Sequence, residues 1–253
     1  NVIMSPKINI FPTQEDLSAA IAGHVAFLAA QATKKRHRFT VALSGGSLMR
    51  ILSPQLVANP LRTDINWSAW HVFWADERCV PLSSPESNYG VANRFLFRHV
   101  GIPREQIHAV DDTLGASETA KKYTSILKKV FGPGTGRLPA FDLILLGIGE
   151  DGHTASLFPN HPLLKETQRW VGPVFNAPKP PPERVTLTLP VINNARHVFF
   201  VAAGEGKQSI LSEVFRPGLH RPRLPAELVS PSAGDLQWFV DGAAAAALRK
   251  HQE

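Results

Sequence analysis

Two patterns of apolar residues alternate along the chain: short continuous runs, and longer segments in which apolar residues recur at helical spacing. The short runs predict buried strands, and the helical spacing predicts amphipathic helices. Predicted strands span residues 7–11, 39–43, 70–75, 106–110, 141–146, 184–189, 197–203 and 236–240. Predicted helices span residues 14–34, 48 to 54 or beyond, 88–100, 117–131, 190–195 and 207–214, and another follows Asp241. Strands that alternate with helices favour a doubly wound α/β fold, with a mostly parallel sheet and helices on both faces.

Glycine-rich turns follow three of the predicted strands. They are Ser44-Gly45-Gly46-Ser47 after strand 39–43, residues 147–153 after strand 141–146, and Gly204-Glu205-Gly206-Lys207 after strand 197–203. The carboxyl ends of parallel strands meet at one edge of the sheet, where open α/β sheets bind their ligands. We therefore expect these turns to form one site.

The turn at 147–153, GIGEDGH, carries the candidate catalytic pair Asp151 and His153. Its glycines match the dinucleotide-binding pattern G-x-G-x-x-G, but Glu150 and Asp151 would then lie beside a pyrophosphate, and Pro159 suits a long crossover helix poorly. A carboxylate two residues from an imidazole fixes the tautomer of the ring and makes it a better base. The alternative is that His153 caps the next helix or faces water.

Three segments are candidates for binding an anion. The Ser44–Ser47 loop joins a strand to a helix, an arrangement that gathers backbone N–H groups around a phosphate, although it also suits a tight connection. Arg78, in Asp76-Glu77-Arg78 after strand 70–75, can grip a phosphate while an acid orients it, unless this segment is a surface turn. Lys207 suits a phosphate equally well, or is a solvated residue in a first helical turn.

Composition narrows the class of protein. A chain of 253 residues suits a single α/β domain over residues 1–253. Its formal charge of +6 is scattered, and we read the one basic cluster, Lys34–Arg38, as a solvated helix end, so we expect no nucleic-acid partner. No apolar stretch approaches the roughly 20 residues of a membrane span, and we expect a cytoplasmic protein without a membrane partner. The single cysteine, Cys79, excludes an internal disulfide and a cysteine-based zinc site.

Six motifs, taken in this order, resemble those of the 6-phosphogluconolactonase family. They are ALSGGS at 42–47, WADERCVP at 74–81, SNYG at 87–90, GIGEDGHTASLFP at 147–159, RVTLTLP at 184–190 and GEGK at 204–207. The resemblance runs from about residue 8 to 246 and implies the fold shared with glucosamine-6-phosphate deaminase and ribose-5-phosphate isomerase. It also implies hydrolysis of 6-phospho-D-glucono-1,5-lactone to 6-phosphogluconate in the pentose phosphate pathway, without a cofactor or a metal. The expected partner is this small-molecule substrate, and the expected state is a monomer or weak homodimer.

The resemblance also implies roles for individual residues. It places the catalytic histidine on His153 and its supporting acid on Asp151. The implied contacts to the sugar phosphate are Ser44, Gly45, Gly46, Ser47, Asp76, Arg78, Arg184 and Lys207. We expect His153 to take a proton from the attacking water and return it to the ring oxygen, with backbone amides of the glycine turn stabilising the oxyanion.

Two other functions remain open at this point. The related deaminases share the Asp-Gly-His turn but typically follow it with Phe-Asn-Glu-Pro, whereas this chain has Ser156-Leu157-Phe158-Pro159, without the acid. A sugar-phosphate sensor that binds without turnover is the second alternative, and the intact Asp151 and His153 argue against it.

Overall fold

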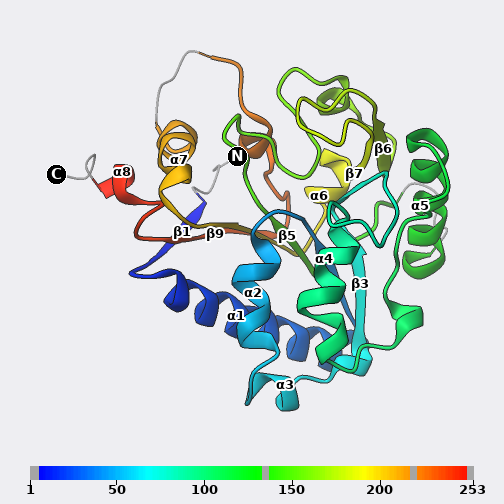
Figure 1. The fold of residues 1–253 in the computed structure, drawn as a ribbon, viewed down its shortest axis with the longest axis horizontal. Helices are drawn as coiled ribbons and strands as arrows, with labels where there is room; N and C mark the ends of the chain where they lie inside the picture. Colours follow the sequence, from blue (N-terminus) through cyan, green and yellow to red (C-terminus); the bar gives the residue numbers. More distant parts are fainter. Residues whose placement is uncertain (1–5, 133–136, 217–220, 250–253) are drawn as a thin grey trace.

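A computed structural model describes residues 6–132, 137–216 and 221–249, and Figure 1 shows their arrangement. A six-stranded sheet crosses the middle of the molecule, and every pair of neighbouring strands in it is parallel. In spatial order its strands are β1 (Lys7–Phe11), β9 (Asp235–Asp241), β8 (His197–Ala202), β5 (Leu143–Leu146), β2 (Phe39–Leu43) and β3 (Trp70–Trp74). The predicted parallel sheet is therefore confirmed.

The order of the strands reverses between β2 and β5. From β2 the chain proceeds outward to β3, whereas from β5 it proceeds in the opposite direction through β8 to β9. The two central strands pair directly, with Ala42 opposite Ile144. A reversal of this kind opens a crevice at the carboxyl ends of the strands, which is where doubly wound sheets bind ligands.

Helices cover both faces of this sheet. The longest are α1 (Gln14–Arg36), α2 (Leu48–Leu56), α4 (Asn88–Phe95), α5 (Ala116–Phe131) and α7 (Gln208–Val214). Side chains alternate between the faces along a strand: on β3, Phe73 packs against Phe131 of α5, whereas Trp74 packs against Tyr89 of α4. α1, α2 and α4 lie together in one layer (Figure 1), and α5 lies on the opposite face. The doubly wound architecture is thus confirmed.

A second, antiparallel sheet of three strands was not predicted. It consists of β4 (Asp76–Arg78), β7 (Arg184–Leu187) and β6 (Val171–Val174), in that order. It continues from the carboxyl end of β3, because Ala75 lies between β3 and β4 and its carbonyl accepts a hydrogen bond from Leu187 N at 2.7 Å. The segment after β3 is therefore a strand rather than a surface turn.

Short elements complete the fold. They are α3 (Leu61–Asp64), α6 (Leu189–Ile192), α8 (Ala246–Arg249) and the 3₁₀ turns η1 (Trp67–Ala69), η2 (Phe97–His99), η3 (Arg104–Gln106), η4 (Pro162–Lys165), η5 (Glu205–Lys207) and η6 (Pro225–Leu228). The predicted strand 106–110 is wrong, since only Ile107 makes an isolated bridge, to Val72. The predicted helix 88–100 is interrupted at Leu96, whose φ of −127° is not helical, and α5 begins at Ala116, before the predicted cap at Ser117.

The basic cluster Lys34–Arg38 is only partly solvated. Arg36 forms an ion pair at 2.7 Å with Asp142, which is 4% exposed, and Arg38 donates a hydrogen bond to Val130 O. The interpretation of this cluster as a solvated helix end is therefore wrong for these two arginines. Residues 132–136, GPGTG, predict the end of α5, and α5 does end at Phe131 with Gly132 as its C-cap. Residues 133–136 of that segment, and residues 217–220 of the basic segment 216–223, lie outside the described residues. Within the described ranges, no helix has the length and apolar character needed to cross a membrane.

Candidate active site

A cavity of about 210 Å³ lies at the carboxyl ends of β2 and β5. It is lined by all the residues predicted for the site except Asp151: Ser44, Gly45, Gly46, Ser47, Asp76, Arg78, His153, Arg184 and Lys207. Its remaining lining residues are Leu48, Gly147, Ile148, Gly149, Glu150, Ala155, Lys179 and Val201. Segments far apart in the sequence therefore converge on one cavity, as expected from the common edge of the strands.

Asp151 lies behind His153 and contacts it directly. The distance from His153 Nδ1 to Asp151 Oδ1 is 2.5 Å, and the same carboxylate oxygen accepts the backbone N–H of His153 at 3.1 Å. A Cβ atom on Gly149 would lie 2.1 Å from the imidazole, so only glycine permits the ring to lie against this turn. Because Nδ1 is held by Asp151, Nε2 is the nitrogen that remains for a ligand in the cavity.

The carboxyl of Asp151 is kept ionised by its partner. Burial acts to raise its pKa, but hydrogen bonds from the side chain and the backbone of His153 outweigh burial and hold the pKa below its usual range. An ionised Asp151 accepts a hydrogen bond from His153 Nδ1–H. A carboxylate in this position stabilises an imidazole ring that takes up a proton at Nε2. The arrangement is that of an oriented general base.

Two hydrogen-bonding groups at the cavity are left without a partner. Ser44 Oγ and Arg78 Nε are buried, and neither has a hydrogen-bond partner among the described residues. Both residues line the cavity. Buried polar groups are nearly always satisfied, so an unpaired hydroxyl and an unpaired guanidinium N–H on two lining residues favour a polar ligand there. The N-terminus of α2 follows the Ser44–Ser47 loop and adds a favourable field for an anion.

Lys207 connects the glycine turn at 204–207 to the turn at 147–153 that carries His153. Its Nζ donates a hydrogen bond to the carbonyl of Ile148 at 2.6 Å. Burial lowers the pKa of the Lys207 ammonium; Glu150 acts against this shift, and Lys179 adds to it. The ammonium therefore lies among other charged groups of the cavity. It has three N–H donors, so those not bound to Ile148 remain for a ligand.

Arg184 has a more structural environment than the predicted substrate contact implies. It is 3% exposed, and its guanidinium donates to the carbonyls of Lys179, Pro180 and Pro181. These bonds fold the proline-rich segment back over β7, and Lys179 consequently lines the cavity. The sequence analysis missed Lys179; its position close before Arg184 in a stiff segment was the available signal.

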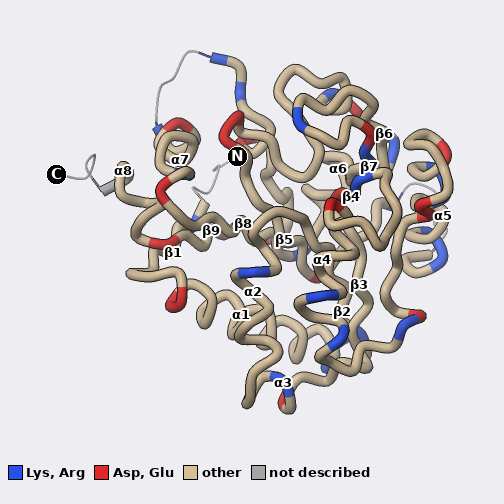
Figure 2. Tube along the Cα trace, in the orientation of Figure 1, with Lys and Arg blue, Asp and Glu red and all other residues tan. Residues whose placement is uncertain are grey.

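Asp76 is the buried acid of the cavity. It is 5% exposed, and its Oδ2 accepts a hydrogen bond from Ser156 Oγ at 2.7 Å. Including the exposed Glu150, the cavity is lined by two acidic and four cationic side chains, Arg78, Lys179, Arg184 and Lys207. The excess of cations favours an anionic ligand. Elsewhere, Figure 2 shows basic and acidic residues spread along the whole chain.

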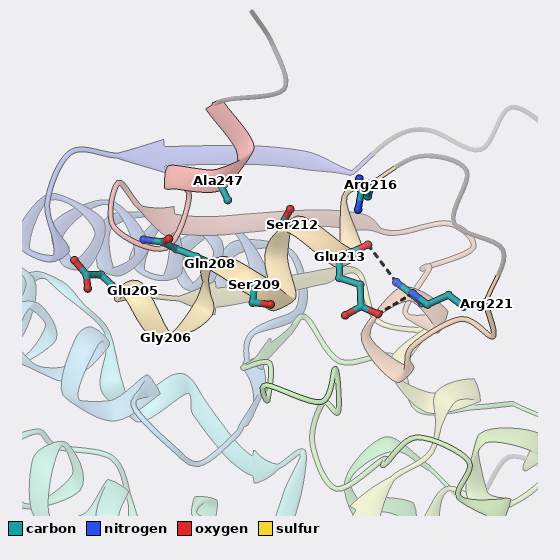
Figure 3. Close-up of a pocket in the computed structure, with 9 residues that line it drawn as sticks. All are labelled: Glu205, Gly206, Gln208, Ser209, Ser212, Glu213, Arg216, Arg221 and Ala247. Carbon is teal, nitrogen blue, oxygen red and sulfur yellow. Dashed lines mark hydrogen bonds and ion pairs between the residues drawn. The ribbon is translucent and has the colours of Figure 1, made fainter.

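A larger cavity, of about 800 Å³, lies beside α7 (Figure 3). Its lining residues are Glu205, Gly206, Gln208, Ser209, Ser212, Glu213, Arg216, Arg221 and Ala247. Its arginines and acids include the ion pair between Arg221 and Glu213. Among the residues that the structure describes, its lining includes no histidine and no orphaned hydroxyl that would support a reaction. The smaller cavity is therefore the candidate active site. No group of three potential metal-ligating side chains occurs in the part of the chain that the structure describes.

Comparison with known proteins agrees with this fold and site. Residues 12–238 match the family described as "Glucosamine-6-phosphate isomerases/6-phosphogluconolactonase", and the chain belongs to this family. The 6-phosphogluconolactonase of Homo sapiens is 43% identical over 240 residues, covering 94% of this chain and 92% of that protein. The "6-phosphogluconolactonase 3, chloroplastic" of Arabidopsis thaliana is 39% identical over 248 residues, covering 96% of this chain and 75% of that protein.

Solved structures show the same architecture. The 6-phosphogluconolactonase from Trypanosoma cruzi superimposes with a TM-score of 0.84 at 28% identity, covering 96% of this chain and 97% of that chain. A monomeric glucosamine-6-phosphate deaminase superimposes with a TM-score of 0.77 at 17% identity, covering 95% of this chain and 99% of that chain. The deaminase fold is therefore common to these proteins, as the sequence motifs implied.

Proposed function

We propose that the chain hydrolyses 6-phospho-D-glucono-1,5-lactone to 6-phosphogluconate. The observation that carries this proposal is the convergence of the Asp151–His153 pair with Arg78, Arg184 and Lys207 on one cavity. An oriented base at one place and a cluster of cations around it suit a substrate with a reactive carbonyl and a phosphate. Relatives about two-fifths identical carry the name of this activity, which supports the same choice.

In the proposed mechanism, neutral His153 acts first as a base and then as an acid. Its Nε2 removes a proton from water as the water oxygen bonds to C1 of the lactone, and the carbonyl electrons move to the oxyanion. When the tetrahedral intermediate collapses, the C1 bond to the ring oxygen breaks and Nε2 returns the proton to that oxygen. Asp151 holds the ring and stabilises its transient positive charge, and backbone amides of the glycine turn stabilise the oxyanion.

The phosphate provides the binding energy that aligns the lactone with His153. We propose that the unpaired Ser44 Oγ and the unpaired Nε of Arg78 donate to the substrate, because both belong to residues that line the cavity and neither has another partner among the described residues. The rest of the Ser44–Ser47 loop, together with Lys207 and Arg184, supplies further donors, and Asp76 accepts from a sugar hydroxyl. No cofactor takes part in this mechanism.

Isomerisation or deamination of an amino-sugar phosphate is the second candidate, since the family description also names glucosamine-6-phosphate isomerases. After the catalytic turn this chain has Ser156, whose hydroxyl is bound to Asp76, and the apolar residues Leu157 and Phe158, which are 0% and 3% exposed. These residues offer no carboxylate where the deaminases have their glutamate. Lactone hydrolysis, which needs one base and no second acid, is therefore favoured.

The decisive experiment measures three reactions on the purified chain. Lactone opening is followed by the acid released from freshly prepared 6-phosphogluconolactone, with correction for spontaneous hydrolysis. Ammonia release from glucosamine 6-phosphate is measured alongside, and binding of 6-phosphogluconate is measured by calorimetry. We expect saturable acceleration of lactone opening and no ammonia. Ammonia release would establish the deaminase, and binding without acceleration would establish a sensor.

Location and assembly are part of the same proposal. We propose a cytoplasmic monomer or weak homodimer that acts on its small-molecule substrate without a nucleic-acid or membrane partner. Some plant relatives are named as chloroplastic proteins, so the fold alone does not set the compartment. Light scattering at several protein concentrations measures the assembly directly.

A further inference from the structure

The carboxylate of Glu77 is buried beside the active site but takes no part in the proposed reaction. Glu77 is 1% exposed and lies in β4 between Asp76 and Arg78, both of which line the cavity. Successive side chains of a strand point to opposite faces, so Glu77 points away from the cavity. Burying a carboxylate costs free energy unless hydrogen bonds satisfy its oxygens, so Glu77 needs several donors.

Three of the four hydrogen-bond partners of Glu77 lie at the N-terminus of α4, and the fourth is the next residue of β4. Glu77 Oε1 accepts the backbone N–H groups of Arg78 at 2.7 Å and Asn88 at 2.8 Å. Its Oε2 accepts Ser87 Oγ at 3.0 Å and the backbone N–H of Tyr89 at 2.9 Å. Burial raises the pKa of the Glu77 carboxyl, and these hydrogen bonds oppose that shift. Glu77 therefore fixes the first turn of α4 to the strand that carries Asp76 and Arg78.

Asn88, held by this carboxylate, packs directly against the loop that follows β2. Its side chain is nearly inaccessible, with the residue 2% exposed, and its Nδ2 donates to Asp76 O at 2.8 Å. A Cβ atom on Gly45 would lie 2.1 Å from Asn88 Oδ1. Unlike Gly46, with its φ of +68°, Gly45 does not have a left-handed backbone. The space occupied by Asn88, rather than the backbone conformation, therefore requires glycine at position 45.

We propose that Glu77 and Asn88 are positioning residues that hold the Ser44–Ser47 loop at the distance required by the phosphate of the substrate. This inference rests on the proposed function. The contacts run from Glu77 to the backbone of Asn88, and from the amide of Asn88 to Gly45. Because Asn88 also binds the carbonyl of Asp76, the same amide joins β4 to the loop after β2. Neither Glu77 nor Asn88 lines the cavity.

The first test is the steady-state kinetics of Asn88→Ala. Loss of a charge-assisted contact to phosphate typically costs a factor of about ten, so we expect KM for 6-phosphogluconolactone to rise about tenfold. The inhibition constant of inorganic phosphate, used as a competitive inhibitor, should rise by a similar factor. The value of kcat should remain within about threefold, because the Asp151–His153 pair is untouched. Glu77→Gln, which retains the size of the side chain but places amide hydrogens against its donors, should shift KM in the same direction.

The second test asks whether Asn88 and Gly45 act through their contact. Gly45→Ala alone should raise KM, because its methyl group would overlap Asn88 Oδ1. In Gly45→Ala combined with Asn88→Ala, the shortened side chain makes room for that methyl group. The rise in KM should then be smaller than the product of the two single effects. Gly101→Ala is the matched control, since a methyl group there meets nothing within 4 Å.

Several outcomes would overturn the inference. An unchanged KM in both Asn88→Ala and Glu77→Gln would do so, as would a loss of kcat with KM preserved. Independent effects in the double variant would show that the contact transmits nothing. If the wild-type protein itself does not accelerate lactone opening, the proposed function fails instead, which separates the two conclusions. A variant that does not fold is replaced by the other one, because both predict the same change in KM.

Discussion

A single short contact defines what His153 is able to do. With its Nδ1 at 2.5 Å from Asp151, the ring is left with Nε2 for a ligand, so in the proposed mechanism one nitrogen accepts and returns a proton while the other is held. Phe158 packs against the ring at 4.7 Å between centroids, which limits its rotation. The orientation of the imidazole is thus set from two sides before a substrate binds.

The first prediction concerns this pair. His153→Ala should lower kcat for lactone opening by about 10²–10⁴, because the general base is lost. Asp151→Asn should lower kcat by a smaller factor, because Asp151 acts only through the ring. The variant that carries both changes should therefore match His153→Ala alone, since residues that act as a unit are not additive.

The comparison is made at saturating lactone, with thermal unfolding of each variant as the control for folding. If the two single effects on kcat multiply in the double variant, then Asp151 has a role separate from His153. If His153→Ala retains near-normal turnover, the imidazole is not the base.

At the residue scale, site residues that are close together in the sequence could be predicted, whereas contacts that depend on tertiary packing could not. Asp151 and His153 could be paired from the sequence because they are two residues apart on a glycine turn. Lys179 was not predicted as a site residue, because it reaches the cavity through the hydrogen bonds that Arg184 makes with the backbone of its segment. The close approach of Asn88 to Gly45 is likewise set by tertiary packing, although both residues lie in recognised motifs.

At the scale of elements, the site depends on where the strands end. The turns after β2, β5 and β8 were predicted to meet because parallel strands share one carboxyl edge, and Ser44, His153 and Lys207 indeed line one cavity. The antiparallel sheet of β4, β7 and β6 was not foreseen. A strand pattern gives no information about its partner, so the run beginning at Arg184 was identified as a strand but not assigned to the smaller sheet.

The segment from Arg221 to Leu228 contacts the turn that carries His153. Arg221 forms ion pairs with Glu213 at 2.8 Å and with Glu227 at 2.7 Å; the pair with Glu213, on α7, is visible in Figure 3. The same segment donates a hydrogen bond from Ala226 N to Gly152 O at 3.1 Å, next to His153. Arg221 therefore connects α7, which follows Lys207, to the turn that carries His153.

The second prediction follows from this connection. Arg221→Leu removes the cationic partner of both glutamates, although Glu227 still accepts the backbone N–H of Leu224. After allowance for the partial exposure of these groups, we expect a loss of about 1 kcal/mol in the free energy of unfolding. The melting temperature should fall by about 2–4 °C. Because the turn at Gly152 loses support, kcat should fall about tenfold with a smaller effect on KM.

Lys121→Leu on α5 is the matched control, since it removes an ion pair with Glu118 whose two side chains are 73% and 61% exposed. We expect its melting temperature and kcat to stay close to those of the unmodified protein. Equal behaviour of the Arg221 and Lys121 variants would mean that the Arg221 contacts do not support the catalytic turn.

At the scale of the whole molecule, the third prediction concerns the stability of the protein in mild acid. His71 at the edge of the large sheet has its Nδ1 3.2 Å from His108 Nε2, and the ring of His108 stacks on Phe73 at 4.4 Å. Burial, with the neighbouring His71, lowers the pKa of His108 to about 4. Burial, with Arg38, also lowers the pKa of His71. Both rings are therefore neutral in the folded protein over a range in which they are protonated in the unfolded chain.

The direction of the effect follows from proton linkage. Between the ordinary histidine pKa of 6.5 and about 4, the unfolded chain binds more protons at these sites, so the free energy of unfolding falls as the pH falls through this window. His161, whose pKa is also lowered by burial, contributes in the same direction.

His108→Phe, which keeps the stack on Phe73 but cannot be protonated, should flatten this dependence, whereas replacing the exposed His99 with Gln should not. Urea unfolding at several pH values between 7 and 5.5 measures the slope. This range lies above the unfolded-chain pKa of the carboxyls Asp111, Asp151 and Glu166, whose pKa values are lowered in the folded protein. A slope unchanged in His108→Phe would show that the histidine pair does not couple folding to pH.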